Sequence, residues 1–283
     1  MQELKDRVAV ITGAGSGIGA GLARRCAAEG MRVVLADVEL GAVEAVAAGL
    51  RQGGTAAEAV GVDVRDPAAL VRLADRTWEA FGACHLLINN AGVVAYRPIV
   101  DLELSDWRWI LSVNLEGVIH GLHAFLPRIR EQGPPAHIVN TASMAGLIPL
   151  QGAGLGAYAA SKYAVVAISE TLRLELAPEN IGVTVVCPGG VDTRINEAER
   201  NRPAELRRSA PVAAPDMQRL AESRRLETPE TFLDADGAAA RILEAVRADE
   251  LYAITHPSWL PLVHERHQNL EAAFTRAAGR WPG

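Results

Sequence analysis

The sequence predicts an α/β fold in which one doubly wound parallel sheet of about seven strands carries helices on both faces. Short, continuous apolar segments alternate with helical segments along most of the chain, which is typical of a parallel sheet buried on both sides. A glycine-rich turn follows the first apolar segment, and polar residues follow several of the others. No internal repeat and no linker-like composition divides the 283 residues, so we expect a single domain over 1–283.

The first strand is expected over Val8–Ile11, and it runs into the turn Thr-Gly-Ala-Gly-Ser-Gly-Ile-Gly at residues 12–19. A helix follows and ends near Glu29. A strand, a glycine turn and a helix in this order form the context of a dinucleotide-binding site. Glycine lets the backbone approach a pyrophosphate, and the helix N-terminus offers N–H groups and a partial positive charge. A glycine turn by itself can also serve only the tight connection between a strand and a helix.

The second strand, expected over Arg32–Ala36, ends at Asp37. A carboxylate in this position can accept hydrogen bonds from the hydroxyls of an adenosine ribose, and it would repel the 2′-phosphate of NADP. Val38 follows it and Ser16 is the variable residue of the turn, so neither supplies a cation, and the arginines of the first helix lie too far along it. We therefore expect NAD as the cofactor. The alternative is that Asp37 only caps the next helix.

The following elements place further polar residues at the ends of strands. They are a helix over Val38–Leu50, a strand over Ala57–Val64, a helix over Pro67–Phe81 capped by Asp66, and a strand over Leu86–Ile88 that continues into Asn89-Asn90-Ala91-Gly92. Parallel strands end at the same edge of a sheet, and ligands bind beyond that edge. Asp37, Asp63 and Asn90 are therefore expected to lie together.

A long helix is expected over Ser105–Arg130, with a lone Asn114 inside it and Pro127 near its end, where a proline kinks or stops a helix. An asparagine in an apolar helix is usually a satisfied structural residue. The next strand, His137–Thr141, is followed by Ser143, and a serine there more often caps a turn than takes part in chemistry. A later strand over Gly182–Cys187 stops at Pro188-Gly189-Gly190.

Tyr158 and Lys162 stand four residues apart in an alanine-rich run without glycine or proline, between these two strands. On a helix they share one face, about 6 Å apart along the axis. A positive charge beside a phenol stabilises its phenolate, and moving a tyrosine pKa from about 10 to about 7 takes roughly 4 kcal/mol. Lys162 with the help of a second positive charge could supply that. Taken alone, a tyrosine and a lysine with this spacing more often lie on an exposed helix face without a catalytic role, but the other motifs favour such a role here.

The composition changes after the sixth strand. The segment 191–229 is rich in arginine, glutamate, alanine and proline and lacks a strand pattern, so we expect a lid over the substrate, the alternative being a solvated insertion. A helix over Asp234–Arg247 and a last strand over Leu251–Thr255 complete the sheet. In the C-terminal extension, 256–283, a helix over His264–Ala278 is expected to cover an edge of the substrate site or of a second subunit.

Composition excludes several classes of function. The formal net charge of −6 argues against nucleic acid as a partner. The three cysteines, Cys26, Cys84 and Cys187, form no metal-binding pattern and indicate a reducing compartment. No apolar segment is long enough to span a membrane, and no signal segment precedes the first strand. We therefore expect a cytoplasmic protein without a metal.

Together these motifs resemble those of the short-chain dehydrogenase/reductase family, over about Leu4 to Thr255. The turn at 12–19 is similar to the family's cofactor turn, and Pro188-Gly189-Gly190-Val191-Asp192-Thr193 to its nicotinamide-side turn. The resemblance implies a Rossmann-type fold and catalytic roles for Asn114, Ser143, Tyr158 and Lys162. It implies that the cofactor is bound by Gly13, Gly15, Ser16, Gly17, Ile18, Gly19, Asp37, Val38, Asp63, Val64, Asn90, Ala91, Gly92, Val113, Tyr158, Lys162, Pro188, Gly189, Val191 and Thr193.

The resemblance also implies a mechanism. Tyr158 exchanges a proton with the substrate oxygen, Lys162 lowers its pKa and holds the cofactor ribose, and Ser143 hydrogen-bonds the substrate oxygen. Asn114 holds a water that links Lys162 to solvent. The reaction implied is the NAD-dependent interconversion of a secondary alcohol and a ketone. The long segments after Pro188 and after the last strand are similar to those of relatives that act on bulky, often aromatic alcohols, including bacterial lignin-fragment dehydrogenases.

Alternatives remain within and outside this family. The same fold could prefer NADP, catalyse another reaction such as epimerisation, or serve as a non-catalytic dinucleotide sensor. The gap between Ser143 and Tyr158 is longer than is usual in the family, with the extra residues in Gln151–Gly156, which leaves the shape of one pocket wall open. The resemblance implies a homodimer or homotetramer in which the helices Ser105–Arg130 and Tyr158–Pro178 pair between subunits.

Overall fold

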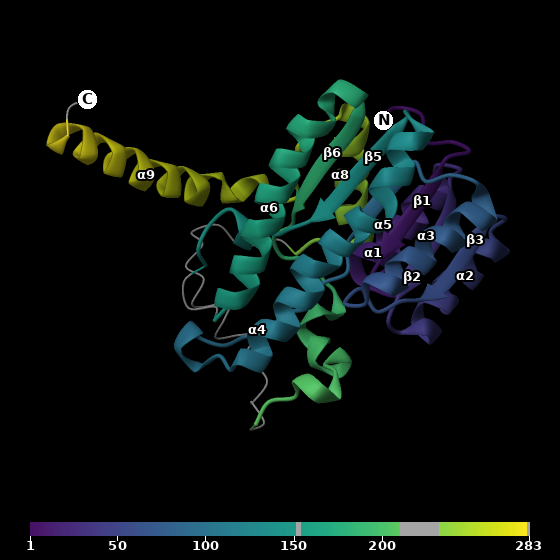
Figure 1. The fold of residues 1–283 in the computed structure, drawn as a ribbon, viewed down its shortest axis with the longest axis horizontal. Coiled ribbons are helices and arrows are strands. Elements are labelled where there is room, and N and C mark those ends of the chain that lie inside the picture. Colours follow the sequence, from purple (N-terminus) through teal and green to yellow (C-terminus); the bar gives the residue numbers. More distant parts are fainter. Residues whose placement is uncertain (151–153, 210–231, 282–283) are drawn as a thin grey trace.

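A parallel sheet of seven strands forms the centre of the computed structural model, which describes residues 1–150, 154–209 and 232–281 (Figure 1). The strand order is β3-β2-β1-β4-β5-β6-β7, and each neighbouring pair runs parallel. The strands are β1 (Val8–Thr12), β2 (Arg32–Asp37), β3 (Ala57–Gly61), β4 (Leu86–Asn89), β5 (Ala136–Thr141), β6 (Ile181–Cys187) and β7 (Tyr252–Ile254). The order reverses between β1 and β4, and such a switch point is where doubly wound sheets bind ligands. The predicted fold class is confirmed.

Helices cover both faces of the sheet because successive side chains of each strand point to opposite sides. Val10 of β1 packs in a core with α3, α5 and α6, whereas its neighbour Ile11 packs in a second core with α1, α2 and α8. The helices are α1 (Gly17–Ala28), α2 (Leu40–Gln52), α3 (Pro67–Phe81), α4 (Leu104–Leu111), α5 (Gly117–Gln132), α6 (Gly156–Leu176), α8 (Ala235–Ala248) and α9 (Leu260–Arg280). The two cores fix the strand ends, and therefore the edge where the polar residues gather.

The long helix expected over Ser105–Arg130 is divided. It consists of α4, a π-helical segment over Ser112–Glu116, and α5. Pro127 lies on the exposed side of α5, and the helix continues past it to Gln132. The division falls at Asn114, whose side chain bonds to another part of the chain, so that tertiary contacts rather than the helical pattern set the local geometry.

Two other predicted boundaries were wrong for local reasons. The strand expected over Ala57–Val64 ends at Gly61, because Asp63 turns back and accepts a hydrogen bond from the backbone N–H of Arg65 at 3.0 Å. The helix expected from Val38 begins at Leu40, because the Asp37 side chain accepts from the backbone N–H of Glu39 at 2.9 Å. In contrast, Asp66 caps α3 as predicted.

The C-terminal helix α9 is longer than predicted and contains no buried residue. Figure 1 shows it in yellow, running away from the rest of the protein. Only its first turns touch the body, where the Arg266 guanidinium lies 5.3 Å from the centre of the Tyr163 ring. No helix among the described residues combines the length and apolar character needed to cross a bilayer. Most of the expected lid, 210–229, and residues 151–153 of the glycine-rich segment lie outside the described residues.

Candidate active site

A cavity of about 270 Å³ opens at the carboxyl edge of the sheet, across the switch point between β1 and β4. Its walls come from the glycine turn, the ends of β2, β4, β5 and β6, helix α6 and the segment after β6. The structure brings most of the expected site residues into its lining: Gly13, Ser16, Gly17, Ile18, Asp37, Val38, Asp63, Val64, Asn90, Ala91, Gly92, Val113, Ser143, Tyr158, Lys162, Pro188, Gly189, Val191 and Thr193. The expected residues Gly15, Gly19 and Asn114 do not line it.

The glycine turn is shaped to hold a negatively charged group. A Cβ at Gly19 would meet the carbonyl oxygen of Gly13 at 2.1 Å, so only glycine lets the turn fold this tightly. Ser16 is the N-cap of α1 but makes no side-chain capping bond, and the first turn of α1 holds no acidic residue. The positive end of the α1 dipole therefore faces the cavity, and these residues fit the pyrophosphate of a dinucleotide.

Asp37 closes one end of the cavity. Its Oδ2 accepts a hydrogen bond from the backbone N–H of Gly15 at 2.8 Å, and its Oδ1 accepts from the N–H of Glu39 at 2.9 Å. Each carboxylate oxygen has two lone pairs, so both can still accept from a ribose hydroxyl. The carboxylate thus holds the glycine turn and also remains able to bind a diol.

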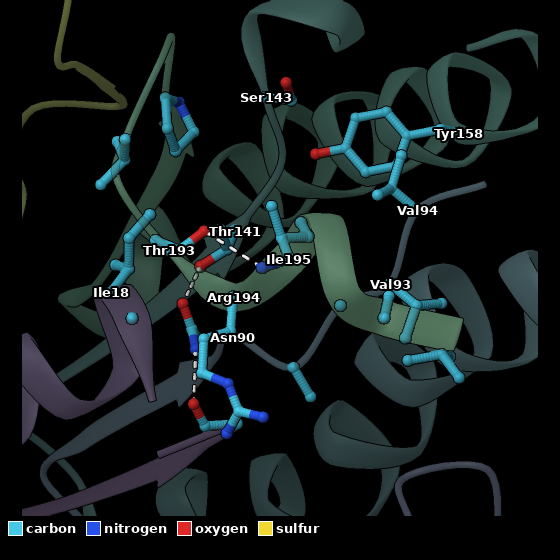
Figure 2. Close-up of a pocket in the computed structure, with 18 of the residues that line it drawn as sticks. Ile18, Asn90, Val93, Val94, Thr141, Ser143, Tyr158, Thr193, Arg194 and Ile195 are labelled. Carbon is cyan, nitrogen blue, oxygen red and sulfur yellow. Dashed lines mark hydrogen bonds between the residues drawn. The ribbon is translucent and has the colours of Figure 1, made fainter. Parts of the chain in front are cut away.

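Asn90 ties the strand ends together beneath the cavity. Its side-chain N–H₂ donates to the carbonyl oxygen of Thr12 at 3.0 Å. Its Oδ1 accepts from the Thr141 hydroxyl at 3.4 Å, as Figure 2 shows. The Thr12 hydroxyl accepts from the backbone N–H groups of Asn90 and Ala91 at 2.9 and 3.1 Å. These bonds join β1, β4 and β5 at the point where a dinucleotide would cross the sheet.

The other end of the cavity holds Tyr158, Lys162 and Ser143. Tyr158 and Lys162 lie on successive turns of α6, with the Lys162 Nζ 5.6 Å from the centre of the tyrosine ring. Figure 2 shows Ser143 and the Tyr158 hydroxyl near each other on one wall. Ser143 also accepts from the backbone N–H of Ala145 at 3.1 Å and so caps a short 3₁₀ turn. Ser143 therefore caps a turn and also faces the cavity.

Burial controls the titration of this pair. It raises the pKa of Tyr158 to about 12, although a hydrogen bond with Ser143 acts in the opposite direction. It lowers the pKa of Lys162 to about 8. The Lys162 ammonium lies over the ring and donates to the carbonyl oxygen of Thr141 at 2.7 Å. In the protein alone, burial thus outweighs the lowering of the Tyr158 pKa expected from Lys162, and a further positive charge beside the pair would favour the phenolate.

Asn114 lies behind the cavity rather than in its wall. Its Oδ1 accepts from the backbone N–H of Val93 at 2.8 Å, and its N–H₂ donates to the carbonyl oxygen of Val93 at 2.9 Å and to the Ser161 hydroxyl at 3.2 Å. Ser161 in turn donates to the carbonyl oxygen of Tyr158 at 2.6 Å. Asn114 therefore couples the loop after β4 to the catalytic turn of α6. Sequence reasoning missed Ser161, although a serine three residues after Tyr158 can bond back to its carbonyl.

Sequence reasoning also missed three arginines that line the cavity, Arg65, Arg194 and Arg200. These arginines come from parts of the chain other than the local residues Ser16 and Val38, and each of them is already paired. Arg65 bonds to Asp63 at 2.7 Å, and Arg200 bonds to Glu39 at 2.8 Å. No sequence pattern indicates the second pair, since its partners are 161 residues apart. Arg24 in α1 bonds to Asp236 of α8 instead.

The first part of the expected lid rests on α4. Arg202 and Arg208 both donate to the fully buried Asp106, at 2.7 and 2.6 Å. The Arg202 guanidinium also lies 4.8 Å from the centre of the Trp109 ring, which lines the cavity. This cluster holds the segment Arg194–Asn201 over the cavity, so this part of the lid is anchored.

Apolar side chains surround the space beside Tyr158. They include Val94, Leu150, Leu155 and Ile195, and Met144 and Trp259 also line the cavity. Val94 and Leu155 form a small apolar cluster against which the Tyr158 ring packs. An alcohol or ketone carried on an apolar body fits this environment better than a charged substrate does.

Comparison with known proteins identifies the family. The sequence profile of the short chain dehydrogenases matches residues 7–204. A 1-deoxy-11-beta-hydroxypentalenate dehydrogenase of Streptomyces exfoliatus is 42% identical over 192 residues, which cover 67% of this chain and 69% of the relative. A C alpha-dehydrogenase of Sphingobium sp. is 36% identical over 259 residues, which cover 91% of this chain and 83% of the relative.

Solved structures of the same family share the whole fold. A short-chain dehydrogenase/reductase from Burkholderia phymatum in complex with NAD has a TM-score of 0.88 and 40% identity, covering 96% of this chain and 97% of that chain. A short-chain dehydrogenase from Burkholderia cenocepacia in complex with NADP has a TM-score of 0.75 and 30% identity, covering 89% and 96%. The chain belongs to the short-chain dehydrogenase/reductase family and is an NAD(P)-dependent oxidoreductase that acts on a CH–OH group.

Proposed function

We propose that the protein interconverts a secondary alcohol and a ketone with NAD as its cofactor, on a bulky apolar or aromatic substrate. The Tyr158 hydroxyl and Ser143 lie near each other on one wall of the cavity. Asp37, which also lines it, ends β2, and β1 and β4 separate that strand from β5, which Ser143 follows. This arrangement carries the proposal. A hydride acceptor and its substrate would meet between the two ends.

Tyr158 and the side chains near it have separate roles in proton transfer. In alcohol oxidation, the Tyr158 phenolate takes the proton of the substrate hydroxyl, and Ser143 donates a hydrogen bond to the same oxygen. When bound, the nicotinamide cofactor accepts the hydride and supplies, in its oxidised form, the positive charge that the phenolate needs. With the cofactor bound, Lys162 would hold its ribose, and the charge of the lysine would add to the charge that favours the phenolate. The Asn114–Ser161 link keeps Tyr158 in place.

The cofactor preference rests on Asp37. Its carboxylate suits the two free hydroxyls of the NAD ribose and opposes the charge of a 2′-phosphate. A solved relative from Burkholderia phymatum contains NAD, whereas one from Burkholderia cenocepacia contains NADP, so both cofactors occur among similar chains. The ion pairs of Arg65 and Arg200 support the NAD preference here, because those cations are occupied.

The substrate class rests on the apolar side chains beside Tyr158. The two relatives are named for a hydroxypentalenate and for a C alpha position, which agrees with oxidation of a hydroxyl on a larger carbon skeleton. We expect a panel of secondary alcohols to be oxidised with kcat/KM rising with apolar bulk. The measurement is the rise in reduced-nicotinamide absorbance with purified protein. A preference for small, charged alcohols would contradict the proposed substrate class.

A further inference from the structure

Glu39 joins the adenosine end of the cavity to the segment that covers it. It lies two residues after Asp37, in the connection between β2 and α2. Its Oε1 accepts from the Arg200 Nε at 2.9 Å and from the Asn201 side chain at 2.9 Å, and the Arg194 Nη1 lies 4.0 Å from its Oε2. Hydrogen bonds from Asn201 and Arg200 lower the pKa of Glu39, so it is charged at neutral pH. Glu39 thus holds Arg200 directly and lies at the limit of ion-pair distance from Arg194, whose Nε bonds to Glu197 at 3.0 Å.

These two cations belong to the same cavity as Asp37. Arg194 and Arg200 both line it together with Asp37 and Val38. The backbone N–H of Glu39 donates to the Asp37 carboxylate, so the two residues share the turn after β2. An arginine that pairs with Glu39 and lines the cavity therefore lies in the same part of the site as Asp37, beside which the ribose of a bound cofactor would lie. Guanidinium groups bind phosphate and carboxylate with the same bidentate geometry, so the two anions compete for them.

We propose that Glu39 is a specificity-determining residue that holds Arg200 in an ion pair, with Arg194 nearby, and so withholds from NADP a cation that its 2′-phosphate would need. This inference rests on the proposed NAD preference and deepens it. Asp37 opposes the phosphate by direct repulsion, whereas Glu39 acts by occupying the groups that would otherwise attract it. Because repulsion by Asp37 and ion pairing by Glu39 depend on different side chains, a substitution at each position can remove one effect without the other.

The substitution Glu39→Gln removes the charge and keeps an amide oxygen that can still accept from Asn201. Made in an Asp37→Ala background, it is expected to tighten the binding of adenosine 2′,5′-bisphosphate at least about tenfold, or about 1.4 kcal/mol. Binding of AMP, which lacks the 2′-phosphate, should change less than about threefold. Calorimetric titration of both nucleotides measures this without any turnover, and unchanged AMP binding shows that the site is still folded.

The gain must depend on the freed arginines. Adding Arg194→Ala and Arg200→Ala to the double variant should abolish it, whereas Glu179→Gln, which breaks the exposed pair with Arg130 far from the cavity, should give no gain. An unchanged affinity for the bisphosphate after Glu39→Gln, or a gain that survives loss of both arginines, would overturn the inference. Equal use of NAD and NADP by the wild-type enzyme would instead overturn the proposed NAD preference, while the arginine-dependent gain in binding would still decide the role of Glu39.

Discussion

The two ends of the cavity differ in the burial and in the ion pairing of their charged groups. At the end with Tyr158, Lys162 is only 2% exposed and bonds to a backbone carbonyl, and Tyr158 is partly buried. At the end with Asp37, the charges are partly exposed and nearly all are paired, Arg65 with Asp63 and Arg200 with Glu39. At the Tyr158 end, exclusion of water sets the properties of the titratable groups, whereas at the Asp37 end the charges are balanced by ion pairs.

Under the proposed function, this difference separates proton transfer at the Tyr158 end from cofactor recognition at the Asp37 end. Burial shifts the pKa of Tyr158 and of Lys162 in opposite directions, both toward the neutral forms. The tyrosine end is therefore sensitive to pH and to the charge of whatever binds beside it. Pairing at the end with Asp37 leaves each charge in place, and under the proposed function the arrangement of partners selects between the two cofactors. The comparison predicts large effects on rate at the first end and moderate effects on selectivity at the second.

The largest effect is expected from Tyr158→Phe, which removes the transferable proton and keeps the ring. Turnover should fall at least about 10²-fold, the low end for loss of a general acid–base. NAD affinity should be nearly unchanged, since the hydroxyl is the only group lost. Tyr163→Phe is the matched control, because that ring lies one turn along the same helix under Arg266. Near-normal turnover of the Tyr158 variant in steady-state kinetics would remove the distinction between the two ends.

The pH dependence of the two reaction directions should have opposite signs. Burial raises the pKa of Tyr158, so the phenolate that oxidation requires is scarce at neutral pH. Alcohol oxidation should therefore rise with pH, by up to about tenfold per unit, while ketone reduction, which uses the phenol, should not. The rise should weaken near pH 8, where Lys162, whose pKa burial lowers to about 8, loses its charge. Profiles of kcat/KM measure this, and parallel profiles in the two directions would contradict it.

Much of the fold was open to prediction because its signals are local. Continuous apolar strands, the glycine turn and the Asp66 cap each lie within a few residues of what they determine. The π-helical segment at Asn114 could not be predicted, since it depends on a bond to Val93, which is 21 residues away. The same holds for the Glu39–Arg200 pair and for the pKa of Tyr158, which depend on packing that no spacing reveals.

Substitutions at the Asp37 end should change the preference between NAD and NADP by a smaller factor than Tyr158→Phe changes turnover. The wild-type enzyme is expected to prefer NAD over NADP at least about tenfold, or about 1.4 kcal/mol. Asp37→Ala combined with Val38→Arg should narrow or reverse this preference, because it removes a repelling charge and adds an attracting one. Steady-state kinetics with both cofactors provide the test. An unchanged ratio in the double variant would show that Asp37 does not decide the selectivity at this end.

The smallest effect concerns stability. The Lys162 pKa is lowered from 10.5 to about 8 in the folded state, so the unfolded chain binds more protons between these values and stability rises with pH there. At pH 7 the buried charge therefore destabilises the fold relative to a neutral side chain, even though the ammonium donates to the carbonyl oxygen of Thr141. Lys162→Met should therefore unfold at the same or a slightly higher temperature at pH 7 without cofactor. A loss of more than about 2 kcal/mol would show that the lysine stabilises the fold.

The most direct test follows reduced-nicotinamide absorbance with NAD and a panel of bulky secondary alcohols, for the wild-type protein and Tyr158→Phe side by side. We predict steady turnover of at least one alcohol by the wild type, and at most about a hundredth of that rate in the variant. Cofactor binding without turnover across the panel would indicate a dinucleotide sensor. Equal rates in the two proteins would contradict the central role of Tyr158.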